Sequence, residues 1–186
     1  MEELWQLYDK QGRVLVGQGA NKDDVFDKAL LHGASHVWIW RKNDNVTEVL
    51  LQKRASNKRT WPNMYDISAA GHIDLGEEPI IAAIREADEE IGLKVEDKDL
   101  ELIAVERRNI VAPNGATENE FCWVYILHLY MSDVFKLQES EVTSLSWKML
   151  SEFKDETFNS SENQYVPHGS KYFNTVISAI ESASAS

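Results

Sequence analysis

Hydrophobic positions along the chain form short runs separated by polar segments rich in glycine, asparagine and charged residues. Runs rich in β-branched and aromatic residues predict strands at residues 4–9, 13–18, 35–42, 47–54, 100–110, 120–131 and 142–150. Residues 65–73 also have an extended pattern, whereas residues 55–64 and 111–119 are polar and predict loops. A short turn separates the first two strands, which are expected to form a hairpin.

Three segments have helical patterns: residues 21–33, which end at Gly33, residues 79–91, which begin at Pro79 and precede Gly92, and the amphipathic residues 170–183. The last five residues, 182–186, are expected to fray. Antiparallel-looking strands with a few separated helices predict an α+β fold.

No internal repeat, long linker or break in composition divides the chain. We therefore expect one principal domain over residues 31–186. Residues 1–30 are expected to form a hairpin and a short helix that are accessory to this domain. They could cover a pocket or mediate a homodimer, and the sequence favours neither role.

The formal net charge of −12 argues against binding to long nucleic acids, which requires clustered Lys and Arg. A small phosphorylated substrate stays possible because a bound metal or a local basic patch can reverse the sign at a site. The single cysteine, Cys122, excludes an intrachain disulfide and is expected to be buried in the apolar run FCWVYIL. That run is too short to span a bilayer, and the acidic N-terminus does not resemble a signal peptide, so we expect a soluble cytoplasmic protein.

The segment GHIDLGEEPIIAAIREADEEIGL, residues 71–93, contains seven carboxylates, one arginine and one histidine. On the predicted helix the apolar positions share one side: Ile80, Ile84, Ala87 and Ile91. Glu86, Glu89 and Glu90 fall on the far side as neighbours. A solvated acidic face is one interpretation, but such a face normally interleaves lysines, and adjacent like charges destabilise a helix. Oxygen ligands for a hard cation such as Mg²⁺ or Mn²⁺ explain the cluster better.

The spacing of this segment resembles the signature of the Nudix hydrolases. Gly71 is followed by five residues and Glu77, and then by seven residues and READEEIGL, residues 85–93. Every fixed position matches, although Ala87 is small where a larger aliphatic residue is usual. The resemblance implies an α/β/α sandwich with a mixed β-sheet and a Mg²⁺-dependent enzyme that cleaves a diphosphate linkage.

The resemblance also implies a role for each charged residue of the motif. The implied metal ligands are Glu86, Glu89, Glu90 and the backbone carbonyl of Gly71. Glu77 would support this site, and Arg85 would hold the glutamates in place. A bound Mg²⁺ neutralises the phosphoryl oxygens, orients the diphosphate and lowers the pKa of a bound water.

Stretches within residues 31–126 resemble the branch of the superfamily that contains isopentenyl diphosphate isomerase. By this resemblance Arg54 and Lys58 grip the substrate diphosphate, and they belong to the densest basic cluster of the chain, with Lys53 and Arg59. Four residues match ligands of the isomerase's metal site: His32, His72, Glu118 and Glu120. His72 and Glu118 are also expected to line the substrate site. Val25 stands where a fifth ligand, a histidine, is required. For His32 a helix-capping or surface role is equally open.

The isomerase has its catalytic cysteine directly before the Gly-His pair, where this chain has Ala70. Alanine has no proton to transfer, and Cys122 lies elsewhere in the sequence. Since the hydrolase motif is complete, we predict hydrolysis rather than isomerisation.

A hydrolase needs a base or a water-orienting group. Glu120 is the first candidate and Glu118 the second; Glu139 and Glu141 are alternatives, because a loop in that region supplies the base in some relatives. Trp61, Tyr65 and Trp123 are candidates for holding the non-phosphate end of the substrate, by stacking on a base or by packing on an isoprenoid chain. Core packing is the alternative role for these aromatic residues.

Two other functions stay open: an isopentenyl diphosphate isomerase, and a non-catalytic module that senses a nucleotide. Ala70 and Val25 speak against the first, and the complete motif speaks against the second. The sequence does not name a substrate. Nucleoside di- and triphosphates, nucleotide sugars, dinucleotides and isoprenoid diphosphates all fit the predicted chemistry.

Overall fold

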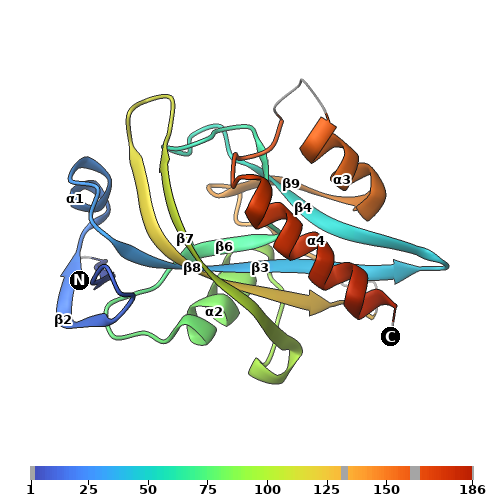
Figure 1. The fold of residues 1–186 in the computed structure, drawn as a ribbon, viewed down its shortest axis with the longest axis horizontal. Coiled ribbons are helices and arrows are strands. Elements are labelled where there is room, and N and C mark those ends of the chain that lie inside the picture. The colour runs from blue at the N-terminus through green and yellow to red at the C-terminus, as the bar shows by residue number, and fades with distance from the viewer. Residues whose placement is uncertain (1–2, 131–133, 160–163, 186) are drawn as a thin grey trace.

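The computed structural model describes residues 3–130, 134–159 and 164–185 (Figure 1). In chain order the elements are β1 (Trp5–Tyr8), β2 (Val14–Ala20), α1 (Lys22–Asp27), β3 (His32–Asn43), β4 (Val46–Arg54), β5 (Tyr65–Asp66), β6 (Ala69–His72), α2 (Pro79–Ile91), the 3₁₀ turn η1 (Asp97–Asp99), β7 (Leu100–Val111), β8 (Thr117–His128), β9 (Val142–Met149), α3 (Leu150–Asn159) and α4 (Ser170–Ser184). Of the predicted segments, residues 131 and 186 lie outside the described ranges. No helix in these ranges is long and apolar enough to cross a membrane.

Strand β3 organises the sheet. It pairs in parallel with β8, from His32 opposite Glu120 to Trp40 opposite His128, and antiparallel with β1, β4 and β6. Its first nine residues are all buried. The parallel and antiparallel pairings make the sheet mixed. A strand covered on both faces has such a continuous buried run, so the sheet is enclosed between helices.

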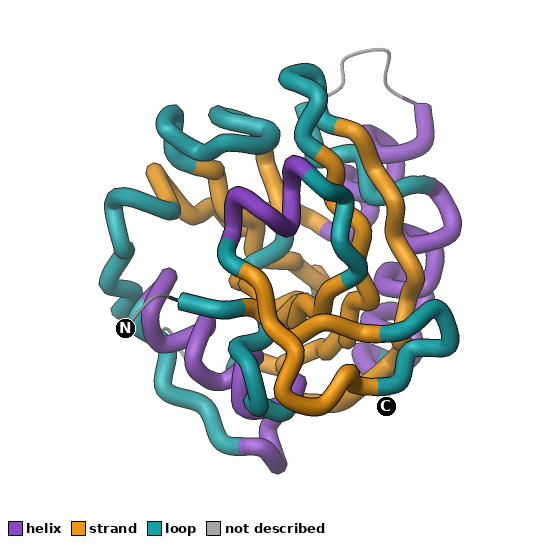
Figure 2. The backbone as a smooth tube through the Cα atoms, turned by 90° about the vertical axis from the view of Figure 1, so that its left-hand side faces the viewer, coloured by secondary structure: helices purple, strands orange, loops and turns teal. Residues whose placement is uncertain are grey.

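Alternating side chains of β3 pack on the two faces of the sheet. Trp38 and Trp40 join the core beneath α3 and α4, whereas Val37 and Ile39 join the core beneath α2. Figure 2 shows helices on both sides of the strands. The predicted α+β fold, an α/β/α sandwich with a mixed sheet, is confirmed.

The N-terminal hairpin β1–β2 and helix α1 pack together beside the sandwich. Their shared core contains Trp5, Ala20, Val25 and Phe26 and continues to Ala112 and Ala116 of the β7–β8 connection. The Asn21 side chain caps α1 by accepting a hydrogen bond from the Asp24 amide at 2.9 Å. Since Val25 is completely buried in this core, the side chain at that position faces the hairpin and not solvent.

The helix predicted at residues 21–33 is shorter than expected. It ends at Asp27, and Ala29 has a left-handed backbone with φ 50°, which a continuing helix cannot accommodate. Gly33 does not end a helix but lies in β3, next to His32, which is 0% exposed. The helix-capping and surface interpretations of His32 are therefore wrong.

Three further boundaries differ from prediction. Helix α3 follows β9 directly and was not predicted; Leu150 and Phe153, one turn apart, are its buried residues. Helix α4 continues through Ser184, so the expected fraying does not extend over residues 182–184. Strand β8 begins at Thr117 because it pairs with β7 up to Val111, and Glu118 therefore lies in the strand and not in the loop.

Candidate active site

Gly71 and Glu86 meet where α2 packs against β6. A Cβ atom built on Gly71 would lie 2.0 Å from the Glu86 carboxyl carbon, a distance at which no side chain fits. Glycine is required here because the Glu86 carboxylate passes directly over the backbone of β6. The glycine and the glutamate of the sequence motif are thus two parts of one contact.

Arg85 joins the loop before α2, strand β6 and the helix itself. Its guanidinium donates two hydrogen bonds to Glu77, at 3.0 and 2.9 Å, and one to the His72 carbonyl at 2.9 Å. The same group donates to Glu86 at 2.6 Å and to Glu89 at 3.3 Å. The hydrogen bonds to Glu77 are the main cause of a raised pKa for Arg85, so this cation is held firmly in its charged form.

Glu90 is buried, and the prediction that it shares an outer face with Glu89 is wrong. Glu90 is 4% exposed, whereas 54% of the Glu89 side chain is exposed. Glu90 lies three residues after Ala87 and therefore points to the sheet side of the helix. There its carboxylate accepts hydrogen bonds from the Ala70 amide at 3.0 Å and from the Gln52 side chain at 3.3 Å.

Burial raises the pKa of Glu86 to about 7. Burial, followed by the nearby charge of Glu86, raises the pKa of Glu90 to about 8. The donor set predicted from the sequence, Glu86, Glu89, Glu90 and the carbonyl of Gly71, contains only oxygen atoms. Such a set fits a hard divalent cation, which would offset the repulsion between the carboxylates.

The terminal carbonyls of α2 are occupied by the segment that precedes β9. The amides of Lys136 and Gln138 donate to the carbonyls of Ile91 and Glu90, both at 2.9 Å. These bonds satisfy groups that a helix end leaves free. They also place Gln138 and Glu141 beside the motif helix, where both residues line the same cavity as the glutamates.

The basic side of the cavity comes from the end of β4 and the loop that follows. Arg54 donates to Asp66 at 2.9 Å and to the carbonyl of Thr60 at 3.0 Å. Lys58 is paired with Glu141. Each of these two cations therefore has a fixed carboxylate partner and is held at the cavity.

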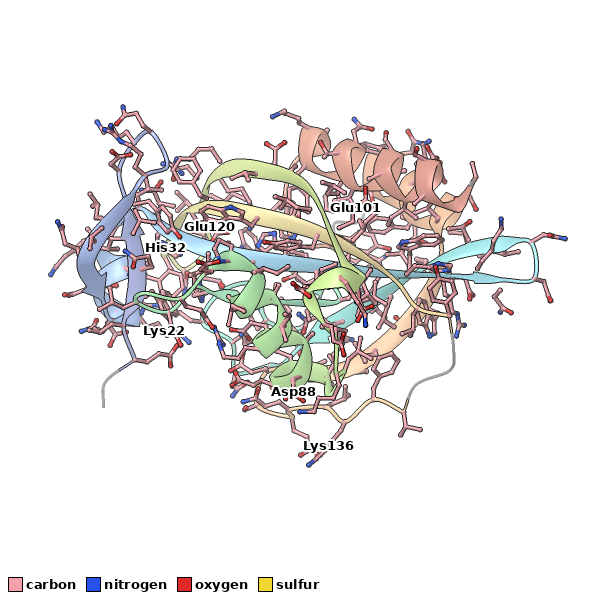
Figure 3. The ribbon with its side chains drawn as sticks, turned by 90° about the horizontal axis from the view of Figure 1, so that it is seen from below. Lys22, His32, Asp88, Glu101, Glu120 and Lys136 are labelled. Carbon is pink, nitrogen blue, oxygen red and sulfur yellow. The ribbon has the colours of Figure 1, made fainter. Side chains whose placement is uncertain are left out.

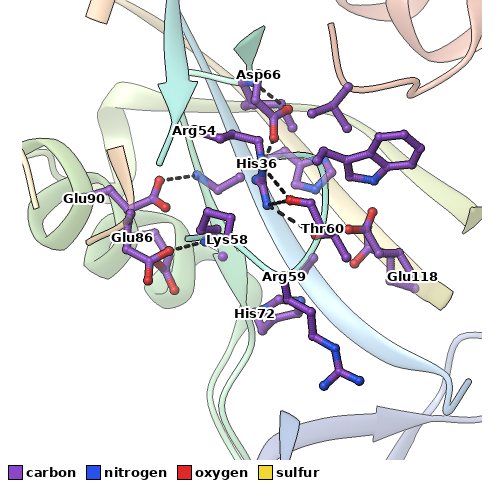
Figure 4. Close-up of a pocket in the computed structure, with 18 of the residues that line it drawn as sticks. His36, Arg54, Lys58, Arg59, Thr60, Asp66, His72, Glu86, Glu90 and Glu118 are labelled. Atoms are coloured by element: carbon purple, nitrogen blue, oxygen red, sulfur yellow. Dashed lines mark hydrogen bonds and ion pairs between the residues drawn. The ribbon is translucent and has the colours of Figure 1, made fainter. Parts of the chain in front are cut away.

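A cavity of about 400 Å³ lies between the carboxylates and these cations (Figure 4). Its lining includes most of the residues predicted for the site: Arg54, Lys58, Trp61, Gly71, His72, Arg85, Glu86, Glu89, Glu90, Glu118 and Glu120. We call the side lined by Glu86, Glu89 and Glu90 the carboxylate end. Tyr65 is absent from the lining; it packs near Tyr165, and Lys53 lies over its ring.

Trp61 and Trp123 differ in position. Trp61 lines the cavity and has a left-handed backbone, with φ 50°. Trp123 packs instead at the edge of the core beneath α2 and against Tyr8, at a ring distance of 5.2 Å. The core-packing alternative therefore describes Trp123, and Trp61 is the tryptophan of the predicted pair that faces the cavity.

Three of the four residues matched to the isomerase's metal site come together. Ligand atoms of His32, His72 and Glu120 lie within 4.8 Å of one another, and His32 Nε2 is 3.4 Å from Glu120 Oε2. Figure 3 labels His32 and Glu120 close together. Trp5 of the N-terminal hairpin stacks on His72 with a ring distance of 3.4 Å and covers the group. Glu118 is directed elsewhere, toward Arg108.

The candidate bases have different surroundings. Arg108 donates to Glu120 at 2.6 Å. Burial alone would raise the pKa of Glu120, but the charge of Arg108, together with the hydrogen bond and charge of His32, outweighs burial and holds this pKa well below the usual range. The pKa of Glu118 is raised by burial and by the charge of Glu120. Glu141 lines the cavity beside α2, whereas Glu139 does not line it.

The cavity-wall residues that sequence reasoning missed include His36, Asp66, Arg108 and His168. His36 lies in a strand-forming run beside apolar residues, which is a signal that could have been used, whereas Arg108 stands among other polar residues of β7 and carries no such signal. Asp66 and His168 carry no local signal, since they are 102 positions apart and meet only in the fold, at 2.7 Å.

The family model for the NUDIX domain matches residues 30–168 of the chain. The chain is 34% identical over 172 residues to Nudix hydrolase 3 of Arabidopsis thaliana, an alignment that covers 90% of this chain but 22% of that protein. It is 30% identical over 147 residues to isopentenyl-diphosphate Delta-isomerase 2 of Photorhabdus laumondii, covering 79% of this chain and 77% of the relative. The chain thus spans about a fifth of the plant relative.

A solved structure with the same fold is that of DR0079 from Deinococcus radiodurans. It superposes with a TM-score of 0.64 over 97% of this chain and 98% of that one, at 16% identity. The family match covers the cavity wall from β3 to the loop before α4 and includes the whole Gly71–Leu93 motif. The chain therefore belongs to the NUDIX domain family.

Proposed function

We propose that the chain is a Mg²⁺-dependent hydrolase that cleaves the diphosphate linkage of a small phosphorylated compound. The contact between Gly71 and Glu86, braced by Arg85 and Glu77, is the observation that carries this proposal. It holds a carboxylate against the backbone of β6, at a cavity with basic groups on another side. That combination suits a metal-bound diphosphate.

In this proposal Glu86, Glu89, Glu90 and the Gly71 carbonyl hold the metal. When bound, Mg²⁺ neutralises phosphoryl oxygens and lowers the pKa of a water. Arg85 positions Glu86 and Glu89 through the hydrogen bonds described above. Arg54 and Lys58 bind the diphosphate, because they bring positive charge to the cavity from the loop after β4.

Glu120 and Glu141 are the two candidates for the base that accepts the proton of the attacking water. Glu120 is held ionised by Arg108, which makes it a weak proton acceptor. Glu141 lies beside the motif helix and pairs with Lys58, which we assign to the diphosphate. This position favours Glu141. Comparison of Glu141→Gln with Glu120→Gln tests the choice, and the variant with the larger loss of kcat identifies the base.

Two observations favour hydrolysis over isomerisation: the residue at the position of the isomerase's catalytic cysteine, and the surroundings of Cys122. Ala70 stands in β6, directly before Gly71, and offers no transferable proton. Cys122 is completely buried, its thiol lies 3.3 Å from Glu120, and burial raises its pKa. A thiol in this state is a poor substitute for a reactive cysteine.

A metal-dependent hydrolysis screen tests the proposal. Nucleotides, nucleotide sugars and isoprenoid diphosphates are incubated with Mg²⁺, and phosphate and diphosphate products are followed by mass. We expect Glu89→Gln and Glu90→Gln to lower kcat by a factor of about 100 or more. Asp88→Asn is the matched control, since Asp88 lies on the same helix but pairs with Lys94 and does not line the cavity.

Full activity in both glutamine variants would contradict the metal assignment. Absence of turnover for the whole panel, together with measured binding of one of its members, would favour a sensing module.

A further inference from the structure

The cavity has a second polar side, away from the motif helix. His36 of β3, Asp66 of β5, Arg108 of β7 and His168 from the loop before α4 line it, and we call it the histidine end. Figure 4 shows Glu86 and Glu90 at the left of the view, Glu118 at the right, and His36 and Asp66 between them. The hydrogen bonds made by these residues show which atoms are left without a protein partner.

The proton on His36 can be placed from its neighbours. The indole N–H of Trp38, which can only donate, donates to the Tyr172 hydroxyl at 2.9 Å. The hydroxyl hydrogen is then directed to His36 Nδ1, at 2.8 Å. His36 Nδ1 is therefore an acceptor, and in the neutral ring the remaining proton lies on Nε2.

The same reasoning applies to His168. Its Nε2 is 2.7 Å from Asp66 Oδ1, and Asp66 also accepts from Arg54 and from the Ile67 amide. A carboxylate with these donors accepts from His168 Nε2–H, so Nδ1 of the neutral ring is a free acceptor. His168 Nδ1 is buried and has no hydrogen-bond partner in the described chain.

Arg108 supplies the complementary atom. Its Nη1 and Nη2 donate to Glu120 and Glu118, at 2.6 and 3.5 Å. Its Nε is buried and has no partner among the described residues. A buried donor left unpaired is costly, as is a buried acceptor, and such groups in native proteins are normally satisfied by a ligand or an ordered water.

We propose that Arg108 Nε and His168 Nδ1 hydrogen-bond an uncharged polar group of the substrate and are specificity determinants against hydrocarbon diphosphates. The inference rests on the proposed hydrolase function and narrows its substrate class. The substrate must offer an acceptor to Arg108 and a donor to His168, as sugar hydroxyls and nucleobases do.

The charges of the histidine end support an uncharged group. Two arginines, Arg54 and Arg108, face three carboxyl groups, those of Asp66, Glu118 and Glu120, so neither sign of charge is in clear excess. A hydrocarbon placed here would leave the Arg108 and His168 atoms unpaired. Sites built to hydrogen-bond a polar group discriminate strongly against analogues that lack it.

Two substitutions remove these atoms and keep the structural contacts. Arg108→Lys retains a cation beside Glu120 but has no Nε donor, and His168→Gln retains a donor for Asp66 but has no Nδ1 acceptor. Arg41→Lys is the matched control, because Arg41 pairs with Glu48 and lies outside the cavity. A cooperative thermal unfolding transition establishes that each variant is folded. If Arg108→Lys does not fold, His168→Gln alone tests the inference.

Binding is measured by calorimetry with Mg²⁺ on the full chain carrying Glu89→Gln, to prevent turnover. The probes are three classes of diphosphate monoester with the same charge: ADP and UDP, dimethylallyl and geranyl diphosphate, and methyl diphosphate. We expect the nucleoside diphosphates to bind more tightly than the hydrocarbon probes. Each of the two variants should weaken ADP and UDP binding by about 10-fold and leave methyl diphosphate binding unchanged.

Four results would overturn the inference: equal or tighter binding of the hydrocarbon probes, equal weakening of all three probe classes by the variants, unchanged discrimination in the variants, or no binding of ADP and UDP at millimolar concentration. Equal weakening would indicate a purely structural role, and unchanged discrimination would indicate that an internal water satisfies these atoms, which also contradicts the inference. Failure of the proposed function has a different signature. Discrimination would persist, but the wild-type chain would hydrolyse none of the probes with Mg²⁺.

Discussion

The two ends of the cavity are built in different ways. At the carboxylate end, Glu86, Glu89 and Glu90 come from one stretch of α2, so their spacing follows from the helix alone. At the histidine end, the lining residues come from three strands and a loop and meet only after the sheet has formed. A local arrangement can be recognised in a sequence, whereas a long-range arrangement has to be observed.

The two ends also differ in how their polar groups are satisfied. Arg85 gives each of its donors to a named acceptor at the carboxylate end. At the histidine end Arg108 and His168 each keep one buried atom without a partner. The first arrangement suits a fixed support, and the second suits a surface completed by another molecule.

The largest effect is expected for Gly71→Ala, which breaks the carboxylate end alone. The added methyl group would lie on the Glu86 carboxylate and displace it. We expect hydrolysis to fall by a factor of about 100 or more, measured as kcat/KM with Mg²⁺. Thermal stability should also fall, and it should recover in the double variant Gly71→Ala Glu86→Ala, in which the clash is gone but activity is not restored.

A smaller effect is expected for Arg85→Lys, which removes the two-pronged contact with Glu77 and the bond to the His72 carbonyl. Lysine cannot reproduce this geometry. We expect a loss of about 1–3 kcal/mol in the free energy of unfolding by urea denaturation. Arg41→Lys is the matched control, since both arginine side chains are 26% exposed; equal losses in the two variants would contradict a special role for Arg85.

The histidine end should make stability depend on pH. Burial, with further contributions from the charges of Arg108 and His168 and against the opposing charges of Glu120 and Asp66, lowers the pKa of His36 to about 3. Below pH 6.5 the unfolded chain binds a proton at this residue and the folded chain does not, so stability falls as the pH falls toward 3. The contribution of His36 between pH 7 and pH 5 is about 2 kcal/mol.

Urea denaturation at the two pH values measures this change. His36→Asn, whose side-chain oxygen can accept from Tyr172 but does not titrate, should flatten the dependence. His168 has a pKa lowered by burial and should contribute in the same direction, so some dependence is expected to persist in the variant. An unchanged slope in His36→Asn would show that this ring is not the titrating group.

The smallest effect is expected at the outer rim of the cavity. Arg59 pairs with Asp23 at 2.7 Å and with Asp27 at 2.5 Å, linking the loop after β4 to α1, but the aspartate side chains are 85% and 65% exposed. Exposed pairs contribute little, so Arg59→Ala should cost less than about 1 kcal/mol in unfolding free energy. A larger loss would mean that packing of Arg59 on the Phe26 ring, at 5.0 Å, stabilises the rim.

The bounds of α2 could be predicted because both ends have local signals, Pro79 at the start and a left-handed Gly92, φ 71°, after the end. The burial of Glu90 could not, since the position is polar in sequence and becomes buried only because Ala70 and Gln52 supply donors there. His32 was misplaced for a related reason. Its strand pairing with Glu120 joins residues that are far apart in the chain.

The hairpin and α1 bear on where this domain begins. The region matched by the family model starts at residue 30, whereas Trp5, Lys22 and Phe26, which precede it, form part of the cavity wall. A shortened protein cut at the family boundary would keep the whole catalytic motif and lose one side of its pocket. A domain exchanged between relatives would therefore have to include the residues before position 30. Without them, the exchanged domain would combine the motif of one protein with the pocket wall of another.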